Sequence, residues 1–507
     1  MKKDETNLEG RKWFMRVLML DLDTLRPDHL GCYGYSRKTS PAIDSIAEEG
    51  VRFENYHCSD APCLPSRAAL TTGRFGIHNG VVNHGGLAAD LRLTGSDRDF
   101  KDVQLENNLF NIFRKAGMHT ASISPFAERH SAFWFNAGLN EIINTGKSGG
   151  ETADEILSPT MDWLERNAEK DNWFLHVNFW DPHTPSRAPM EMGNPFEKDP
   201  APGWVTEEVF AKHRKDVGPH GANEINMYDD CTRNGFPRQL GKASDLKEVR
   251  QVFDGYDTGV LYMDSRINQI LDLLKDKGLY ENTAIIVTSD HGENLGELGI
   301  YQEHATADEI TTRIPMIIKW PGCKGGRADK GLHYHLDFLP ALSDLLGGES
   351  CEKWDGQSYA KALKTGAECG RDYLVLSQCA HVCQRSVRFD DYIYIRTYHD
   401  GFHLFEKEML FNIREDYHEQ KNLAGRRPDL CAAACRYLVD WEQDMRRTAD
   451  SDVDPLSTVL LEGGPYHARG HLKQYVQRLE ATGRKEGAEL LRNRHPEEFK
   501  QEGKTRC

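Results

Sequence analysis

The 507-residue sequence lacks a hydrophobic run long enough to cross a membrane, and its first residues lack the pattern of a signal peptide. The apolar run at residues 17–20 is short and is followed by acidic residues, which is typical of the end of a buried strand. We therefore expect no membrane partner and a cytoplasmic location. A secreted or periplasmic location stays open if a leader has been removed.

Positive charge is also scarce in this sequence. The 79 Asp and Glu residues outnumber the 63 Lys and Arg residues, so the net charge is −16. This balance argues against nucleic acid or an anionic membrane surface as a partner. An enzyme with this charge that acts on anions would need its positive charge concentrated at the site.

The twelve cysteines lack a spacing typical of a disulfide framework or a zinc site. The pairs Cys379/Cys383 and Cys431/Cys435 resemble halves of metal sites, but no second matching pair accompanies either one. Internal repeats and low-complexity tracts are absent as well. With 39% hydrophobic and 28% charged residues, the composition predicts an ordinary globular protein with reduced thiols.

The stretch CLPSRAALTTGR, residues 63–74, has the strongest local pattern. Pro65 favours the first turn of a helix, because its φ is already helical and it has no N–H to satisfy. Gly73 favours the end of that helix. Cys63 would then lie at a helix N-terminus, where the dipole favours an anion and lowers the pKa of a thiol.

This stretch resembles the motif of the type I sulfatases, Cys-x-Pro-Ser-Arg followed by Leu-x-Thr-Gly. Every position of the motif is filled, by Cys63, Pro65, Ser66, Arg67, Leu70, Thr72 and Gly73. In that family a formylglycine-generating enzyme or an anaerobic sulfatase maturase oxidises the cysteine to formylglycine, whose hydrate is the nucleophile. The resemblance implies that position 63 is catalytic and that Arg67 stabilises its anionic form. The alternative is a buried cysteine before an ordinary helix.

Two acidic positions, Asp21 and Asp23, stand at the end of a predicted strand at residues 16–23. Being two apart, they face the same side of that strand, and ligands of open α/β sheets bind at this end. Paired carboxylates suit a hard divalent cation. Asp23 matches the first aspartate of the sulfatase metal motif, but Thr24 stands where the family often has a second one. Asp21 or Thr24 could compensate; a solvated turn is the alternative.

A second acidic motif, Asp290-His291-Gly292, follows the predicted strand TAIIVTS at residues 283–289. It resembles the second sulfatase metal motif. Two strands far apart in the sequence would thus deliver carboxylates to one edge of a sheet. The resemblance implies that Asp23, Asp290 and His291, together with position 63, hold Ca²⁺ or another divalent cation.

Four further residues fall where the family has catalytic or sulfate-binding groups. Arg129 and His130 follow the predicted strand HTASIS, in place of the Gly-Lys-x-His of many sulfatases. His183, between two prolines after the strand WFLHVNFW, resembles the histidine that binds the ester oxygen. His304 falls where many members have a lysine that assists the leaving group. The resemblance implies that His183 and His304 assist the departing alcohol and that His130 then takes a proton from the remaining hydroxyl.

The chain organisation is predicted from changes in its pattern. A large catalytic domain would span residues 1–348, with a variable, lid-like insertion at 186–250 that is rich in Pro, Gly and charge. A small C-terminal domain would span 349–450, and a polar tail with a helix near 472–491 would span 451–507. The loops around Asn83, His84 and the sequence GGPYHARGH (463–471) either contact substrate or are solvated.

The resemblance covers roughly residues 15–425 and implies an α/β fold, the alkaline-phosphatase-like sandwich. In it, a large mostly parallel mixed sheet lies between helices, and a small four-stranded antiparallel sheet with a helix follows. The implied function is a sulfatase that hydrolyses sulfate monoesters of a carbohydrate derived from glycosaminoglycans or mucins. The alternatives are a phosphonate monoester hydrolase or phosphodiesterase with the same site, and an inactive protein that binds sulfated glycans.

Overall fold

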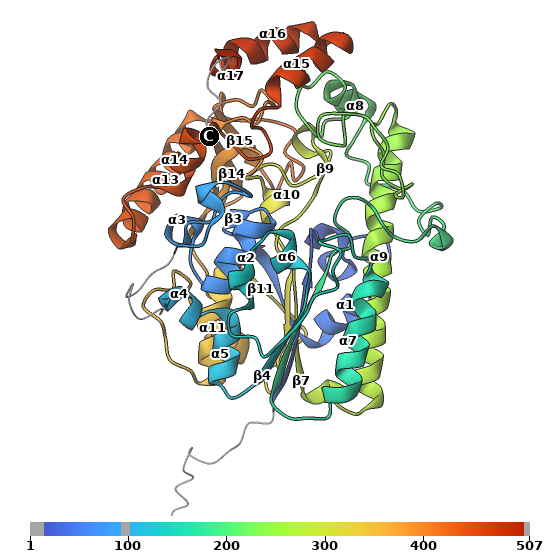
Figure 1. The fold of residues 1–507 in the computed structure, drawn as a ribbon, viewed down its shortest axis with the longest axis vertical. Coiled ribbons are helices and arrows are strands. Elements are labelled where there is room, and N and C mark those ends of the chain that lie inside the picture. The colour runs from blue at the N-terminus through green and yellow to red at the C-terminus, as the bar shows by residue number, and fades with distance from the viewer. Residues whose placement is uncertain (1–14, 93–101, 501–507) are drawn as a thin grey trace, which may run out of the picture.

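The computed structural model describes residues 15–92 and 102–500, and its central element is the first strand, β1 (Arg16–Leu22) (Figure 1). The side chains of β1 alternate between two hydrophobic cores. Val17 and Met19 pack into one core, whereas Leu18 and Leu20 pack into the other. Both faces of this strand are therefore buried, as expected for a strand in a parallel sheet covered by helices on both sides.

The large sheet has eight strands. Its order is β11 (Arg327–Tyr334), β2 (Val51–His57), β10 (Met316–Lys319), β7 (Thr283–Thr288), β1, β6 (Trp173–Phe179), β4 (His119–Ile123) and β5 (Glu141–Ile143). β10 runs antiparallel to both neighbours, and the other pairings of this sheet are parallel. The predicted mixed, mostly parallel sheet is confirmed.

Helices cover both faces of this sheet (Figure 1). One face carries α1 (Pro41–Glu49), α7 (Ala153–Asn167) and α9 (Leu246–Asp276), and the other carries α2 (Cys63–Thr72), α5 (Leu109–Lys115) and α11 (Phe338–Leu346). Short elements at the sheet ends include α3 (Gly76–Asn79), α6 (Phe126–Arg129), α10 (Glu309–Thr312), α12 (Ala360–Thr365) and the hairpin β8 (Asn294–Leu295) and β9 (Tyr301–Glu303). The structure is the three-layer sandwich that the sequence predicts.

A second sheet joins the C-terminal part to the segment just before Cys63. Its antiparallel strands are β12 (Tyr373–Gln378), β13 (Cys383–Phe389), β14 (Tyr392–His399) and β15 (Glu408–Asn412), packed against α13 (Pro428–Thr448). A fifth strand, β3 (Asp60–Ala61), pairs parallel with β12. The four antiparallel strands and the helix that the sequence predicts for the C-terminal domain are confirmed, and β3 extends their sheet from the large domain. The predicted boundary at 348/349 stays a prediction, but backbone hydrogen bonds cross it.

Two predicted helices are each interrupted. The apolar periodicity of residues 105–116 predicts one helix, but the structure has α4 (Val103–Glu106) followed by α5, because the side chain of Asn108 caps a new helix by accepting the Asn111 N–H. The predicted tail helix is α15 (Leu472–Ala481) followed by α16 (Lys485–Arg494). Gly483 separates them with a φ of 81°, in the left-handed region that glycine adopts at little cost.

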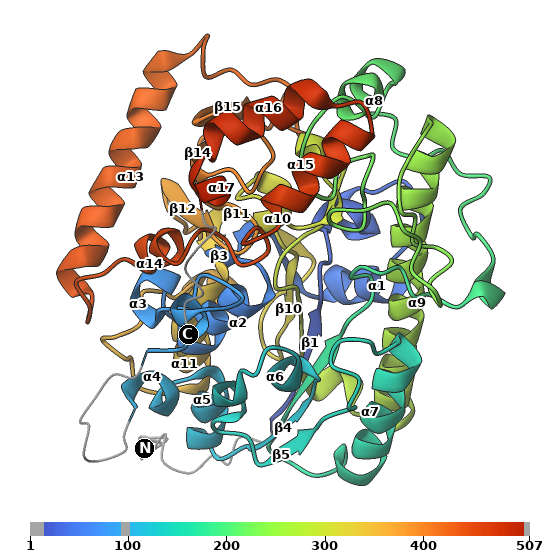
Figure 2. The ribbon, with the colours of Figure 1, turned by 45° about the horizontal axis from the view of Figure 1, so that its top comes forward.

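The polar tail is packed onto the insertion. It contains α14 (Pro455–Leu461), α15, α16 and α17 (Glu497–Lys500), and α15 and α16 lie near α8 (Glu207–His213) of the insertion (Figures 1 and 2). Glu224 of the insertion is fully buried, accepts two 2.7 Å hydrogen bonds from Arg484 and accepts one from the Tyr475 hydroxyl at 2.8 Å. Within residues 15–92 and 102–500, every helix is too short or too polar to span a membrane.

Candidate active site

The carboxyl ends of four parallel strands bring the predicted site residues to one edge of the large sheet. β7, β1, β6 and β4 are four consecutive strands of this sheet and run in the same direction. The residues that follow these ends are Asp23, His130, His183, Asp290 and His291. Since parallel strands present their carboxyl ends together, residues far apart in sequence meet here.

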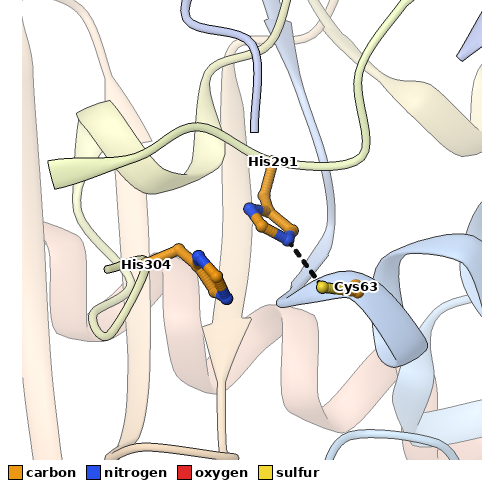
Figure 3. A group of neighbouring side chains, drawn as sticks. All are labelled: Cys63, His291 and His304. Atoms are coloured by element: carbon orange, nitrogen blue, oxygen red, sulfur yellow. Dashed lines mark hydrogen bonds between the residues drawn. The ribbon is translucent and has the colours of Figure 1, made fainter. Parts of the chain in front are cut away.

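Cys63 lies at the N-terminus of α2, as the sequence predicts, and α2 ends at Gly73 with a φ of 69°. The side chain of Cys63 is buried, and its Sγ lies 3.1 Å from Nε2 of His291 (Figure 3). Burial alone would raise the pKa of this thiol, but the charge of His291 and the contacts with His130, His183 and His291 lower it well below its ordinary value. The unmodified side chain is therefore held as an anion, which is the reactive form of a cysteine.

Asp23, Cys63, Asp290 and His291 form a buried group whose ligand atoms all lie within 4.8 Å of one another. Both carboxylate oxygens of Asp23 are buried without a hydrogen-bond partner. Burial, then the negative charges of Asp290 and Cys63, raise the pKa of Asp23 well above its usual range. Because Asp23 accepts no hydrogen bond and lies against the negative charges of Asp290 and Cys63, these residues fit a divalent metal ion.

The orientation of His291 agrees with a ligand role. Its Nδ1–H donates to the carbonyl oxygen of Gly292 at 2.9 Å, which turns Nε2 toward the carboxylates and Cys63. Metal-binding histidines commonly donate their second ring nitrogen to a carbonyl in this way.

Arg67 contacts the carboxylates of Asp23 and Asp290 and also pairs with Asp21. Its guanidinium donates to both oxygens of Asp21, at 2.9 and 3.2 Å, and it lies 3.1 Å from Asp23 and in contact with Asp290. Asp21 thus lies outside the four-residue group, and its metal role stays a prediction. Thr24 donates its N–H to Asp290, while its hydroxyl is buried without a hydrogen-bond partner.

His304 lies beside His291 and the thiol of Cys63 (Figure 3), and two glutamates flank its ring. Its Nε2 is 2.9 Å from Glu303 and its Nδ1 is 3.3 Å from Glu293, and its ring centre is 4.0 Å from that of His291. Burial disfavours the charged ring, but the charge of Glu303 and the hydrogen bonds that the ring donates to Cys63 and Glu293 raise the pKa of His304 well above its ordinary value. The ring is an imidazolium at neutral pH and can donate a proton.

His183 and His130 are neutral by contrast. Burial lowers the pKa of His183 to about 4, and burial also lowers the pKa of His130. The Nδ1–H of His183 donates to the carbonyl of Thr184, so its Nε2, 4.0 Å from Asp23, carries a lone pair. Nε2 of His130 is buried without a hydrogen-bond partner. Both rings are suited to accept a proton.

Arg129 is placed differently from the other predicted residues. Its side chain is exposed, its guanidinium lies 5.1 Å from the ring centre of Trp180, and it donates to the carbonyl of Ser148. It therefore lies farther out than the buried histidines. Its sulfate-binding role stays a prediction.

Some neighbours of this site carry no motif in the sequence. Glu293 and Glu303 flank His304, while His220 comes from the insertion and His381 from the β12–β13 loop. Glu303 could have been predicted as a site residue, because in the sequence it is a carboxylate directly before His304. His220 and His381 had none, because only tertiary contacts bring their loops to the sheet edge.

The loops whose role the sequence left open do reach this region. Nδ1 of His84 lies 3.0 Å from Nε2 of His467, and the ring of His467 stacks on His381 with centres 4.2 Å apart. The backbone N–H of Tyr466 donates to Asn83. The segment at 463–471 is therefore packed into the site, although contact with substrate stays a prediction.

The sulfatase family model matches residues 16–348, about two thirds of the chain and all of the motif-bearing segments described above. The chain belongs to the sulfatase family. This match confirms the family that the Cys63 motif predicts. Metal and formylglycine chemistry are properties of this family, and the four-residue group at Asp23 provides a place for the metal.

Relatives of this sulfatase include enzymes of sulfated carbohydrates. The N-acetylglucosamine-6-O-sulfatase of Bacteroides thetaiotaomicron is 22% identical over 88% of this chain and 89% of its own. A protein solved in complex with its substrate D-glucosamine-2-N,6-O-disulfate shares the fold, with a TM-score of 0.67 and 19% identity over 87% of this chain and 99% of that chain. The phosphonate monoester hydrolase of Silicibacter pomeroyi shares it too, with a TM-score of 0.64 and 20% identity over 86% and 96%.

Proposed function

We propose that this sulfatase hydrolyses a sulfate monoester of a carbohydrate, such as a mono- or disaccharide derived from glycosaminoglycans or mucins. The observation that carries the proposal is the position of Cys63. It completes the sulfatase motif, begins a buried helix and lies within 4.8 Å of the ligand atoms of Asp23, Asp290 and His291. The carbohydrate class rests on relatives that act on sulfated glucosamines.

The cofactors would be a divalent cation and formylglycine at position 63. Asp23, Asp290, His291 and position 63 would hold the cation, and hard carboxylate oxygens favour Ca²⁺. When bound, such a cation polarises a sulfate oxygen and stabilises an anionic nucleophile. Formylglycine, once made by a maturase, supplies a hydroxyl as the nucleophile.

Arg67 would act through position and charge. Its guanidinium is buried against three carboxylates, which fixes the direction in which Asp23 and Asp290 present their free oxygens. It also keeps the net negative charge of this region low enough for an anionic sulfate to approach.

The three histidines divide the proton transfers between them. His304, held as an imidazolium by Glu293 and Glu303, donates a proton to the departing sugar oxygen. His183 and His130 are neutral and lie beside the side chain at position 63, so each can take a proton from a hydroxyl there. Thr184 fixes the tautomer of His183 that leaves Nε2 free to accept.

This division differs in one role from the one implied by sequence resemblance. The sequence assigns both His183 and His304 to the leaving group. The geometry favours His304 alone as donor, because a sugar alkoxide needs a proton and only this histidine has two carboxylates that keep it protonated.

The test is a side-by-side assay on the matured enzyme. Sulfated disaccharides, an aryl sulfate, a phosphonate monoester and a phosphate diester are compared by kcat/KM, with the Cys63→Ala variant as the blank. We expect the sulfated sugar to be hydrolysed and the variant to be inactive. Preference for the phosphonate or the diester would favour the hydrolase class of the structural neighbour, and binding without turnover would favour a glycan-binding protein.

A further inference from the structure

A second group of buried ligand atoms lies beside the active site, and only one of its three members, Glu303, takes part in the proposed steps. Its members are His220 from the insertion, Glu303 at the end of β9 and His381 from the β12–β13 loop. The exposed fractions of these residues are 3%, 7% and 6%. Three segments that are remote in sequence thus converge on one buried point.

The separations between these atoms are those of ligands around one ion. Nε2 of His220 lies 3.3 Å from Oε2 of Glu303, and Nε2 of His381 lies 3.6 Å from Oε1 of Glu303. One ligand atom from each residue can be chosen so that all three lie within 4.8 Å of one another. Metal–ligand bonds of about 2.0–2.2 Å in a tetrahedral site place neighbouring ligand atoms about 3.3–3.6 Å apart.

The environment of His220 gives a second, independent indication. Its Nδ1–H donates to the carbonyl of Ile225 at 3.0 Å, which leaves the lone pair on Nε2. That Nε2 is buried, has no hydrogen-bond partner and faces a carboxylate oxygen. Two acceptors that face each other in a buried place are unfavourable unless a cation lies between them.

Hydrogen bonds and ring stacking hold these segments in place before anything binds. The carbonyl of His220 accepts the Tyr301 N–H at 2.8 Å, which ties the insertion to the strand that carries Glu303. The N–H of His381 donates to Gln378, and the ring of His467 stacks on that of His381. Burial lowers the pKa of His220 and of His381, which favours the neutral imidazole that binds metals.

We propose that His220, Glu303 and His381 form a second metal site, which takes a divalent transition ion such as Zn²⁺. Two imidazole nitrogens and one carboxylate are typical ligands of zinc, whereas the carboxylate-rich group at Asp23 suits a harder cation. A three-residue set leaves one coordination position for water or a substrate oxygen. Oε1 of Glu303 also contacts Nε2 of His304, the proposed proton donor. The carboxylate of Glu303 would therefore link an ion at this site to His304.

Metal binding to the full-length chain tests this proposal without reference to activity. In a Cys63→Ala/Asp290→Ala background, which removes ligands of the first group, we expect one Co²⁺ per chain with visible bands typical of tetrahedral nitrogen and oxygen ligands. Adding His220→Gln should lower the affinity by more than the roughly 10- to 100-fold that loss of an outer hydrogen-bond partner costs a metal site. Adding His84→Gln, a neighbouring histidine outside the group, should leave the affinity unchanged.

A wild-type crystal soaked in Zn²⁺ gives the same test without any substitution that could impair folding. Anomalous scattering at the zinc edge should show a peak between His220, Glu303 and His381, separate from any peak beside Asp23. A peak beside Asp23 alone would overturn the proposal, and so would Co²⁺ binding that His220→Gln leaves unchanged. The result does not depend on whether the enzyme hydrolyses sulfate, so failure here would leave the proposed function standing.

Discussion

Two sets of side chains surround position 63, and the chain brings them there in different ways. The inner set follows strand ends of the large sheet and consists of Asp23, His183, Asp290 and His291. The outer set comes from the insertion, the second sheet and the tail, and consists of His220, His381 and His467. The inner set has the groups for bond cleavage, whereas the outer set has the loops that can vary with the substrate.

The largest effect on activity is expected within the inner set. Asp290→Ala removes a ligand of the four-residue group, and a metal ion supplies several kcal/mol of stabilisation, so kcat/KM should fall by about 10³-fold or more. Metal analysis of the purified variant should show that the cation is lost. Asp181→Asn, a buried carboxyl after β6 that lies outside the group, should keep it. Stoichiometric cation in Asp290→Ala would show that Asp290 is not a ligand.

The second prediction concerns His304, which lies between the two sets. It distinguishes a role in proton donation from a role in sulfate binding. His304→Ala should lower kcat/KM by about 10²- to 10⁴-fold on a sulfated sugar, which leaves as a basic alkoxide. On an aryl sulfate, whose leaving group needs little protonation, the loss should be only a few-fold. His130→Ala, which affects a step after the alcohol has left, should lower kcat on both substrates equally. Equal losses for His304→Ala as well would make it a sulfate-binding residue instead.

A third prediction concerns how the outer set is held. Glu224→Gln removes the negative charge that forms an ion pair with Arg484 and accepts a hydrogen bond from the Tyr475 hydroxyl. This substitution should lower the free energy of unfolding by about 2 kcal/mol. Protease cleavage near residue 450 should become faster, because the tail is released from the insertion. Glu486→Gln, an exposed position on α16, is the control and should change neither measurement. An unchanged cleavage rate in Glu224→Gln would mean that other contacts hold the tail.

The smallest effect is expected for the tail histidine. His467→Ala removes the stacking on His381 and the contact with His84, so kcat/KM on a sulfated disaccharide should fall about tenfold, or about 1.4 kcal/mol, mostly through KM. The rate on a small aryl sulfate should be unchanged, since such a substrate does not reach the tail. The matched control is His471→Ala, because the ring of His471 stacks on Tyr228. A kcat effect on both substrates would move His467 into the inner set.

The inner set could be predicted from the sequence because strand ends leave a local pattern. Asp23 and Asp290 each follow a short apolar run, and a parallel sheet brings such ends together whatever the intervening chain does. Pro65 and Gly73 likewise mark both ends of α2 by their own backbone preferences. The family resemblance then assigned roles that these patterns alone do not contain.

The outer set could not be predicted, because its geometry depends on tertiary contacts alone. His220 reaches Glu303 through a backbone hydrogen bond between the insertion and Tyr301, a pairing that no periodicity announces. The parallel pairing of β3 with β12 escaped prediction for the same reason, since a two-residue strand has no detectable alternation. Asn108 and Gly483, which interrupt the predicted helices, are visible in the sequence as a cap and a stop and were usable signals.

The state of Cys63 in active enzyme tests the central claim most directly. The protein is produced with a sulfatase maturase, and its activity on a sulfated sugar is measured. The mass of the tryptic peptide that contains residue 63 is determined by mass spectrometry, and the peptide is treated with a hydrazide. The account predicts that this peptide is lighter than its cysteine form, reacts with the hydrazide and increases in parallel with activity, while Cys58 stays unmodified. Full activity in protein whose residue 63 is only unmodified cysteine would contradict the account.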